Sequence, residues 1–376
     1  MDKKSILIPV VIFAVFAGLY LSITIYNKND LLFRPVWDID HYRSIAEEGY
    51  VARPCDPARD YPMGEVCGNV GWFPAWPAAV RILSLGQVRS GMMVLPYLFS
   101  FLGFIIFYNI LRRLSDDKAA LIGTIALAAT PTAFYFLTGF PYSLMLFLFG
   151  AYLYYLYASK TRGRAYMLPL LAFFISLSYP SAFIMAVIPL VMLVNRYRKT
   201  VLRPHWQRVT KDIAYYILPF ALGPLFLSLY FYIKFDDFLL TLHFQEKYDR
   251  QWGFPLTVIR QSLKHFRFQS DAHFMDFAHT CFLANFSIIW YGLIFFIFFP
   301  YRIKPELTAY FLALYLFSPA TGSVISIWRH FILLFPAAMI IAVSPRPRWV
   351  KLAYIALGLL LALFIYYPKF MKGYLI

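Results

Sequence analysis

Long apolar runs recur along the whole chain, and they constrain its fold more than any other feature. Runs of ~18 or more apolar residues are long enough to cross a bilayer as helices. The chain of 376 residues is 61% hydrophobic and only 14% charged, whereas soluble domains carry roughly a quarter charged residues. The sequence therefore predicts an all-α polytopic integral membrane protein.

The apolar runs divide one membrane domain, residues 1–376, into about eleven predicted transmembrane helices. These are expected at 5–26, 91–111, 119–138, 143–158, 165–178, 182–195, 213–233, 281–299, 306–319, 329–343 and 350–367. No small-residue cleavage site follows the first run, so we interpret it as a retained helix and not as a signal peptide. Two long polar intervals remain, 27–90 and 234–280, and amphipathic helices are expected in the first, near 39–49 and 75–86.

The formal net charge of +16 is arranged as a topology signal. The basic residues sit in short clusters between apolar runs, which indicates membrane orientation, and no nucleic-acid partner is expected. The strongest cluster, at 196–211, marks the cytoplasmic side. The N-terminus is then inside, and both polar intervals, with nearly all acidic residues, share the extracytoplasmic face.

The first polar interval contains the stretch WDIDHYRSIAEEGY, which concentrates charged residues that a bilayer span does not need. It is therefore the candidate site of chemistry. Asp38 can act as a general base toward an acceptor hydroxyl, or it can merely cap the following helix. On a helix Asp40 points away from Asp38, and His41 is placed to hydrogen-bond Asp38 or to bind phosphate. Their spacing matches no compact metal motif, so no cofactor is predicted and a divalent cation is left open.

Aromatic and cysteine residues fill the rest of this interval. Four aromatic side chains would form either an interfacial belt or a platform on which a sugar ring stacks: Tyr61, Trp72, Phe73 and Trp76. Cys55 and Cys67 lie in the same outer loop, and we expect them to form a disulfide. Cys281 lies near the end of a predicted span and is interpreted as a core residue.

Three segments resemble the PIG-V-like mannosyltransferases, which are the GPI mannosyltransferase 2 family and its prokaryotic relatives. The first carries the family's opening signature at Trp37-Asp38, His41-Tyr42, Ile45-Ala46, Gly49-Tyr50 and Phe73-Pro74 with Pro77. The second, FDDFLLTLHFQEKYDRQWGFP, matches at Asp237, Phe244, Gln245 and Trp252. The third, SIWRHFILLFP, matches at Arg329 and Phe335-Pro336.

The resemblance implies a C-type glycosyltransferase bundle that moves mannose from a polyprenyl phosphate sugar donor to a lipid-linked or glycolipid acceptor. Asp38 would be the general base of an inverting transfer. Arg329 would bind the donor phosphate, because a cation stabilises the leaving group; without the family match it could equally extend to the interface. Further phosphate-binding candidates are His330, Lys247 and Arg250. Substrate-binding candidates are Trp37, Tyr42, Trp72, Phe73, Tyr142, Gln245 and Trp252.

Three positions depart from the family pattern. Leu144 follows Tyr142-Ser143 where the family has an acid, SYPSAF lacks the family's arginine, and Asp236 replaces a glycine. These departures bear on the acceptor more than on the fold. The sequence leaves open the identity of the acceptor and of the donor sugar, as well as the oligomeric state.

Two other function classes fit this composition: a non-catalytic subunit of a glycan assembly pathway, or a lipid-linked sugar transporter. A transporter would place buried charges at mid-span and often contains internal repeats, whereas the charges here gather in outer loops. In a non-catalytic subunit, substitution of Asp38 would leave turnover unchanged. The chain length and the lack of added loops favour the plasma membrane of a prokaryote; in a eukaryote we would expect the ER membrane with a luminal site.

Cysteine labelling tests the predicted orientation. A cysteine introduced at Asp60 or Glu246 should react with a membrane-impermeant maleimide in intact cells, because both positions lie in the outer intervals. A cysteine at Arg203 should react only after the membrane is opened. Labelling of position 203 from outside would reverse the topology.

Overall fold

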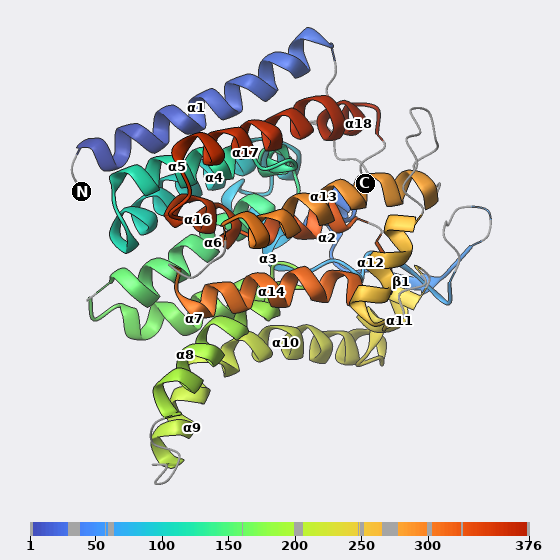
Figure 1. The fold of residues 1–376 in the computed structure, drawn as a ribbon. Helices are drawn as coiled ribbons and strands as arrows, with labels where there is room; N and C mark the ends of the chain where they lie inside the picture. Colours follow the sequence, from blue (N-terminus) through green and yellow to red (C-terminus); the bar gives the residue numbers. More distant parts are fainter. Residues whose placement is uncertain are drawn as a thin grey trace.

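The computed structural model describes residues 3–28, 38–56, 58, 64–159, 161–198, 206–246, 248, 252–264, 277–298, 303–324 and 326–373. Helices dominate it (Figure 1). The first α-helices are α1 (Lys3–Tyr26), α2 (Asp38–Glu48), α3 (Ala75–Leu83), α4 (Val88–Leu114), α5 (Asp117–Ala128), α6 (Tyr142–Leu153), α7 (Arg164–Ser176), α8 (Val187–Tyr197) and α9 (Trp206–Tyr216). The later ones are α10 (Leu218–Phe235), α11 (Leu240–Glu246), α12 (Pro255–Lys264), α13 (Phe277–Phe298), α14 (Pro305–Ala320), α15 (Ile327–His330), α16 (Pro336–Val343), α17 (Arg348–Leu361) and α18 (Tyr367–Met371). Shorter pieces are the 3₁₀ turns η1 (Ala133–Leu137), η3 (Ala182–Ala186) and η4 (Phe331–Leu333), the π turns η2 (Tyr154–Ala158) and η5 (Ala362–Tyr366), and the strands β1 (Ala52–Pro54) and β2 (Val66–Gly68).

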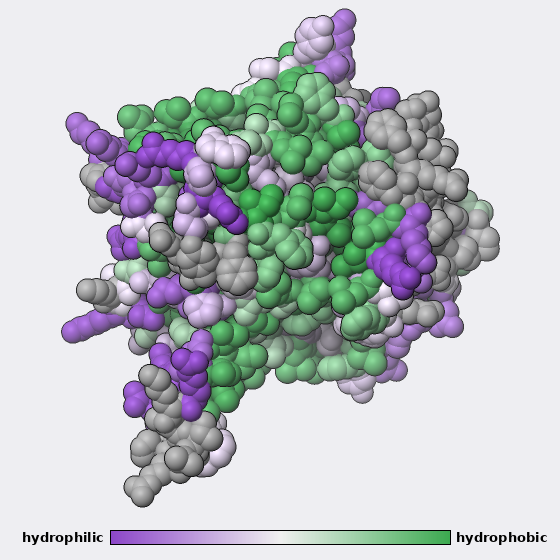
Figure 2. Space-filling view, in the orientation of Figure 1, coloured by the Kyte–Doolittle hydropathy of each residue, from purple (hydrophilic) through white to green (hydrophobic). Residues whose placement is uncertain are grey.

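Among the described residues, five helices are long and apolar enough to cross a membrane. They are α1, α4, α10, Cys281–Phe298 of α13, and the continuous helix Arg348–Met371. Several of these helices run in similar directions in Figure 1, and the same view in Figure 2 shows a broad apolar belt with hydrophilic residues gathered toward its edges. This agrees with the predicted helical membrane protein, and the number of eleven spans stays a prediction.

Four predicted spans are not continuous α-helices, which corrects their expected boundaries. The run 213–233 is divided between α9 and α10, and the run 182–195 begins as η3 before it continues as α8. The run 119–138 is α-helical only to Ala128, then passes Pro131 into η1. The run 329–343 divides into α15, η4 and α16, and α16 has only 8 residues. Proline interrupts the helical hydrogen bonds at these points. Irregular backbone at membrane depth is tolerated where protein surrounds it, and residues 129–146 are buried throughout.

Side chains of neighbouring helices satisfy the backbone of the first break. The Ser100 hydroxyl donates to the carbonyl of Phe136 at 2.6 Å, and the Trp76 indole N–H donates to the carbonyl of Gly139 at 2.6 Å. A Cβ at Gly139 would lie 2.8 Å from the Ile39 side chain. Glycine at this position therefore lets α2 pack directly on the turn between η1 and α6.

The two polar intervals meet at one end of the helical bundle, on the right in Figure 1. The Phe244 ring of α11 packs on Gly71, where a Cβ would lie 2.5 Å from the ring. The Lys234 ammonium at the end of α10 donates to the carbonyl of Tyr50 at 2.7 Å. The described parts of 27–90 and 234–280 thus share one face, as the charge pattern predicts.

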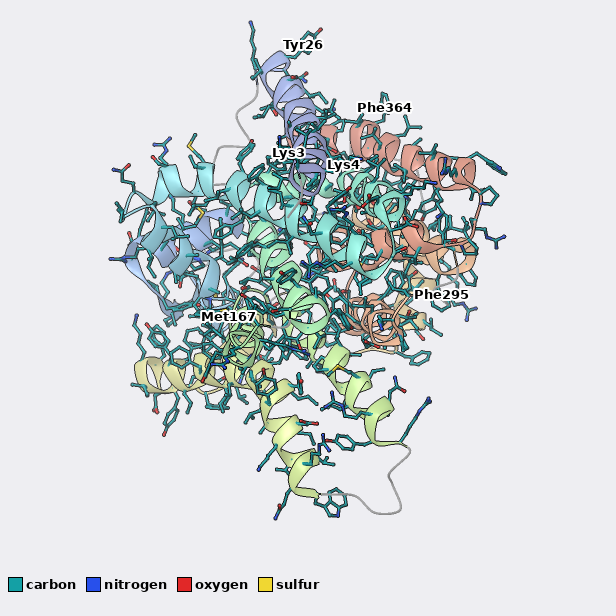
Figure 3. The ribbon with its side chains drawn as sticks, turned by 90° about the vertical axis from the view of Figure 1, so that its left-hand side faces the viewer. Lys3, Lys4, Tyr26, Met167, Phe295 and Phe364 are labelled. Atoms are coloured by element: carbon teal, nitrogen blue, oxygen red, sulfur yellow. A yellow bond between two sulfur atoms is a disulfide. The ribbon has the colours of Figure 1, made fainter. Side chains whose placement is uncertain are left out.

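The opposite end carries the start of α1 and the protruding pair α8 and α9 (Figures 1 and 3). No residue of α9 is buried. Its Asp212 accepts a hydrogen bond from Arg196 of α8 at 2.8 Å. This end contains the described part of the basic cluster 196–211, while 199–205 lie outside the described residues.

A β-hairpin interrupts the first polar interval and is absent from the all-α prediction. Strand β1 pairs antiparallel with β2, with Arg53 opposite Cys67. A disulfide joins Cys55 to Cys67, with their Cα atoms 4.9 Å apart. The bridge brackets the segment between the strands, and this explains why two three-residue strands stay paired. Cys281 is buried and is not disulfide-bonded.

We expect non-reducing mass spectrometry of protein from its native membrane to yield one peptide pair linked through Cys55 and Cys67. Cys281 should react with maleimide only after denaturation, because it is buried. The matched control is the Cys67→Ser variant, which should release Cys55 as a free thiol. Two free outer thiols in the native protein would contradict the pairing.

Candidate active site

Four segments that are distant from one another in sequence meet near the start of α2, and one of them carries Arg329. The guanidinium Nη1 donates to Asp38 Oδ2 at 2.7 Å, and Nη2 donates to Ser326 Oγ at 2.6 Å. Its carbon Cζ lies 5.3 Å from the centroid of the Phe140 ring. The fourth segment, the turn 177–181, reaches the same place through Tyr179, which lies beside His330.

The Asp38–Arg329 ion pair is the principal charge feature of the site. The Arg329 side chain is 8% exposed, and the Asp38 side chain is 29% exposed. Removing an isolated charge from water costs several kcal/mol per ion after relaxation, unless a partner and hydrogen bonds compensate. The arginine is therefore a buried, paired cation, which corrects the interpretation that it extends to the membrane interface.

The short helix α15 holds the guanidinium in place. Ser326, which precedes the helix, has φ +61°, in the left-handed region that side chains other than glycine rarely adopt. This conformation accompanies the contact of its hydroxyl with the arginine three residues later. The Arg329 Nε is buried without a hydrogen-bond partner, so the guanidinium keeps an N–H donor beyond those that bind Asp38 and Ser326.

A second polar row lies next to this pair. The hydroxyls of Tyr142 and Tyr179 are 3.1 Å apart, and the Tyr179 hydroxyl is 3.4 Å from His330 Nδ1. The sequence prediction included Tyr142 and His330 but missed Tyr179. The sequence contained a pattern that could have identified Tyr179. The turn SYPS lies between two apolar runs and repeats the Tyr, Pro and Ser of the turn TGFPYS, which contains Tyr142.

Helix α2 positions the carboxylate from the outer interval. It begins at Asp38 and ends at Glu48, one residue earlier at each end than predicted. Asp38 is the first helical residue and does not precede the helix as the capping interpretation expected, and the contact seen for its side chain is the ion pair with Arg329. Ile39 and Tyr42 are buried, at 1% and 2% exposure, and they anchor the first turn of the helix against the interior.

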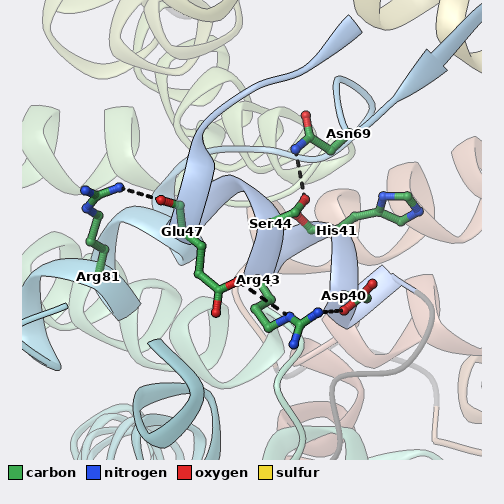
Figure 4. A network of polar contacts seen from close by, with 7 residues as sticks. All are labelled: Asp40, His41, Arg43, Ser44, Glu47, Asn69 and Arg81. Atoms are coloured by element: carbon green, nitrogen blue, oxygen red, sulfur yellow. Dashed lines mark hydrogen bonds and ion pairs between the residues drawn. The ribbon is translucent and has the colours of Figure 1, made fainter. Parts of the chain in front are cut away.

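Asp40 and His41 do not join the Arg329 cluster, although both were catalytic candidates. Asp40 is exposed and its carboxylate lies 2.7 Å from Arg43 Nη2 (Figure 4). The ring of His41 stacks on Trp72, with centroids 3.7 Å apart. The helix period explains the separation of the two acids, because residues two apart point in different directions.

The three predicted aromatic residues that the structure describes form neither an exposed belt nor an open platform. Trp72 and Phe73 are buried, at 8% and 6% exposure, and Trp76 is fully buried. Trp72 lies between His41 and Phe244, whose ring meets it edge-on at 5.3 Å. The stack therefore joins the two outer intervals, which is a packing role.

Two further substrate-binding candidates belong to the second polar interval. The amide of Gln245 lies beside Gly71, and Trp252 is 80% exposed, with its ring 5.8 Å from that of Phe317. Asp237 Oδ2 lies 2.7 Å from His243 Nδ1, and this hydrogen bond raises the pKa of His243.

Several candidates cannot be placed. Trp37, Tyr61, Lys247 and Arg250 lie outside the described residues. Within the described ranges, no three His, Cys, Asp or Glu side chains form a group that could hold a metal ion.

No protein-family model matches the chain, and no curated protein matches it. Among solved structures, the apo crystal structure of an oligosaccharyltransferase from Archaeoglobus fulgidus is similar, with a TM-score of 0.49 and 16% sequence identity. The similarity covers 99% of this chain and 56% of that chain, so this protein spans about half the length of that structure. The resemblance to the PIG-V-like family therefore rests on the motifs quoted above, and the role of the site is inferred from its own residues.

Proposed function

We propose that this protein is a membrane glycosyltransferase that moves a sugar from a polyprenyl phosphate sugar to a lipid-linked or glycolipid acceptor on the extracytoplasmic face. Mannose is the sugar that the motif resemblance favours. The observation that carries the proposal is the contact of Arg329 Nη1 with Asp38 Oδ2 at 2.7 Å. It places a buried cation beside a carboxylate that solvent still reaches, where an outer-loop helix meets the interior.

In this mechanism Arg329 binds the donor phosphate. The charge stays fixed while the phosphate becomes the leaving group, and preorganised charges of this kind stabilise transition states. The unpartnered Nε offers a donor that is not already committed to Asp38 or Ser326. A guanidinium presents five N–H donors in a planar fork, so it can bind a carboxylate and a phosphate together.

Asp38 acts as the general base. Its Oδ1 is not engaged by Arg329 and can accept the proton of the acceptor hydroxyl. The acceptor oxygen forms a bond to the anomeric carbon as the bond from that carbon to the phosphate oxygen breaks. Polyprenyl phosphate leaves with the bonding electron pair, and the sugar configuration is inverted.

A transporter of lipid-linked sugars is the second candidate, and one observation favours it. Arg329 is buried and does not lie in an outer loop, and buried charges within the membrane also mark transport pathways. A transport function predicts substrate-dependent movement across vesicles without any sugar transfer. Transfer of radiolabelled mannose from polyprenyl phosphate mannose by the purified protein would exclude transport as its only function.

Asp38→Asn should lower turnover by about a hundredfold or more, because a positioned general base contributes typically 10²–10⁴-fold. The measurement is transfer from radiolabelled polyprenyl phosphate mannose by protein of verified expression. Asp40→Asn is the matched control, since Asp40 is exposed and forms its ion pair with Arg43 on the surface of the same helix. Comparable turnover of both variants and wild type would refute the assignment of Asp38.

A double variant of Asp38 and Arg329 separates a catalytic role of the ion pair from a role in charge neutralisation alone. Asp38→Asn alone should destabilise the protein by ~3–5 kcal/mol, because it leaves a buried charge unpaired. Adding Arg329→Gln should restore the Tm measured in detergent but not the transfer rate. Arg329→Gln alone should lower kcat/KM by about 10²–10³-fold. If the double variant regained turnover together with stability, the pair would serve the fold and not the reaction.

A further inference from the structure

Helices α8 and α9 form an arm that extends sideways from the helical bundle. Figure 1 shows both helices leaving the bundle across the direction in which α10 runs, and Figure 3, which views this end, shows them pointing away from the other helices. Asp212 of α9 joins the two helices, because it accepts hydrogen bonds from Arg196 at 2.8 Å and from the Tyr197 hydroxyl at 2.6 Å. Neither the proposed reaction nor the motif resemblance uses this arm.

The length of α10 places the arm at the boundary between bilayer and water. Only Ile217 separates α9 from α10, and Pro219 in the first turn of α10 interrupts the helical hydrogen bonds there. Helix α10 is a candidate span of 18 residues, which at 1.5 Å per residue cover about 27 Å, close to the ~30 Å of a hydrocarbon core. Its far end reaches the outer interval, where Lys234 binds the carbonyl of Tyr50. Helix α9 therefore begins where α10 leaves the hydrocarbon.

Both helices of the arm expose apolar side chains. On α9, Trp206 and Ile213 are 70% and 45% exposed, and their spacing of seven residues puts them on one face, which we call the α9 stripe. On α8, Leu190 and Val194 are 47% and 57% exposed and lie one turn apart. Helices that lie in the membrane interface bury such an aromatic and aliphatic face among the lipids. The exposed apolar surface of the arm thus fits contact with lipid.

The arm also carries a large excess of positive charge. The segment 187–217 contains six Lys/Arg and one acid, Asp212, so its net charge is +5. Because Arg196 already pairs with that acid, the other cations find no carboxylate within the arm. Arg208 and Lys211 are exposed on α9 itself. A topology signal requires only the charge, whereas an apolar stripe on the same helix indicates a surface that is both lipidic and negative, as anionic headgroups are.

We propose that the arm binds anionic phospholipids in the leaflet at this end of the bundle. The α9 stripe inserts roughly 5–10 Å into the boundary between headgroups and acyl chains, and Arg208 and Lys211 bind the headgroup phosphates. Each Lys or Arg near an anionic membrane surface strengthens such binding about fivefold. An acidic soluble protein would match the charge, but the stripe of a helix at the bilayer boundary already lies against lipid. The inference does not depend on sugar transfer.

A fluorescent probe on α9 tests where the stripe lies in the full-length protein. Ile213→Cys carries a nitrobenzoxadiazole label, which is selective because Cys281 is buried and Cys55 is bonded to Cys67. The nanodiscs contain phosphatidylcholine, increasing fractions of phosphatidylglycerol, and a lipid with a doxyl quencher near its headgroup. Quenching at position 213 should rise with the phosphatidylglycerol fraction. The same label in Gln207→Cys, an exposed position off the stripe, should stay weakly quenched.

Charge variants of the labelled protein test the recognition of anionic lipid. Arg208→Gln combined with Lys211→Gln should weaken the binding of the arm to phosphatidylglycerol about 25-fold, because two charges near the surface are lost. The matched control combines Arg260→Gln with Lys264→Gln, which removes two exposed cations from α12 at the other end of the bundle (Figure 1). The control should leave the phosphatidylglycerol titration unchanged. High salt should weaken quenching at position 213, because it screens exposed charges.

Each outcome of the titration decides the proposal. Quenching at position 213 that requires phosphatidylglycerol and is lost only in the α9 charge variant would support it. Equal quenching in nanodiscs with and without phosphatidylglycerol would show apolar insertion alone and would overturn the recognition of anionic lipid. A probe that stays unquenched in every nanodisc would place the stripe in water, which rejects the proposal in favour of a soluble partner. Equal losses in both charge variants would also reject it, since the effect would then follow the charge of the whole protein.

Discussion

The buried guanidinium of Arg329 constrains the end of the helical bundle at which the two polar intervals meet. The Arg329 side chain is almost excluded from solvent, and an unpaired charge in that position would cost several kcal/mol. Its carboxylate partner comes from a helix nearly three hundred residues away in sequence. The buried arginine is therefore neutralised only when α2 packs against the interior. The absence of a Cβ at Gly139 allows Ile39 of α2 to approach closely enough for this packing.

The broken helices follow from the same requirement. A continuous helix directs its backbone polar groups along its own axis and offers few of them to a site. The breaks before α6 and α16 bring Phe140 and Arg329 into one interior region. Ser100 and Trp76 donate hydrogen bonds to backbone carbonyls in the first of these breaks. Surrounding protein makes these breaks tolerable at membrane depth. The irregular segments are thus where chemistry is possible, and the long helices hold them in register.

Hydrophobic patterning predicted the helical class, both polar intervals and their shared face, since these depend on local composition and charge. The motif residues placed Asp38 and Arg329 in one candidate site. Their pairing could not be predicted, because no local pattern states which distant carboxylate meets a buried arginine. The breaks at Pro131 and before Pro336 were missed for a related reason: the surrounding runs stay apolar whether a helix continues or turns inside the protein. Tyr179 was missed because its role depends on contact with Tyr142, 37 residues earlier.

Stability alone does not account for the ion pair. Replacing a buried pair by well-packed apolar residues is often neutral or stabilising, because neither charge then has to leave water. A chain that is 61% hydrophobic has ample means to fill this position without charge. Ser326 adds a left-handed backbone conformation at the same place, and such strain tends to cluster at functional sites. A costly charge, a strained residue and an uncommitted N–H donor occur within four residues of each other. The proposed phosphate ligand would account for all three features at once.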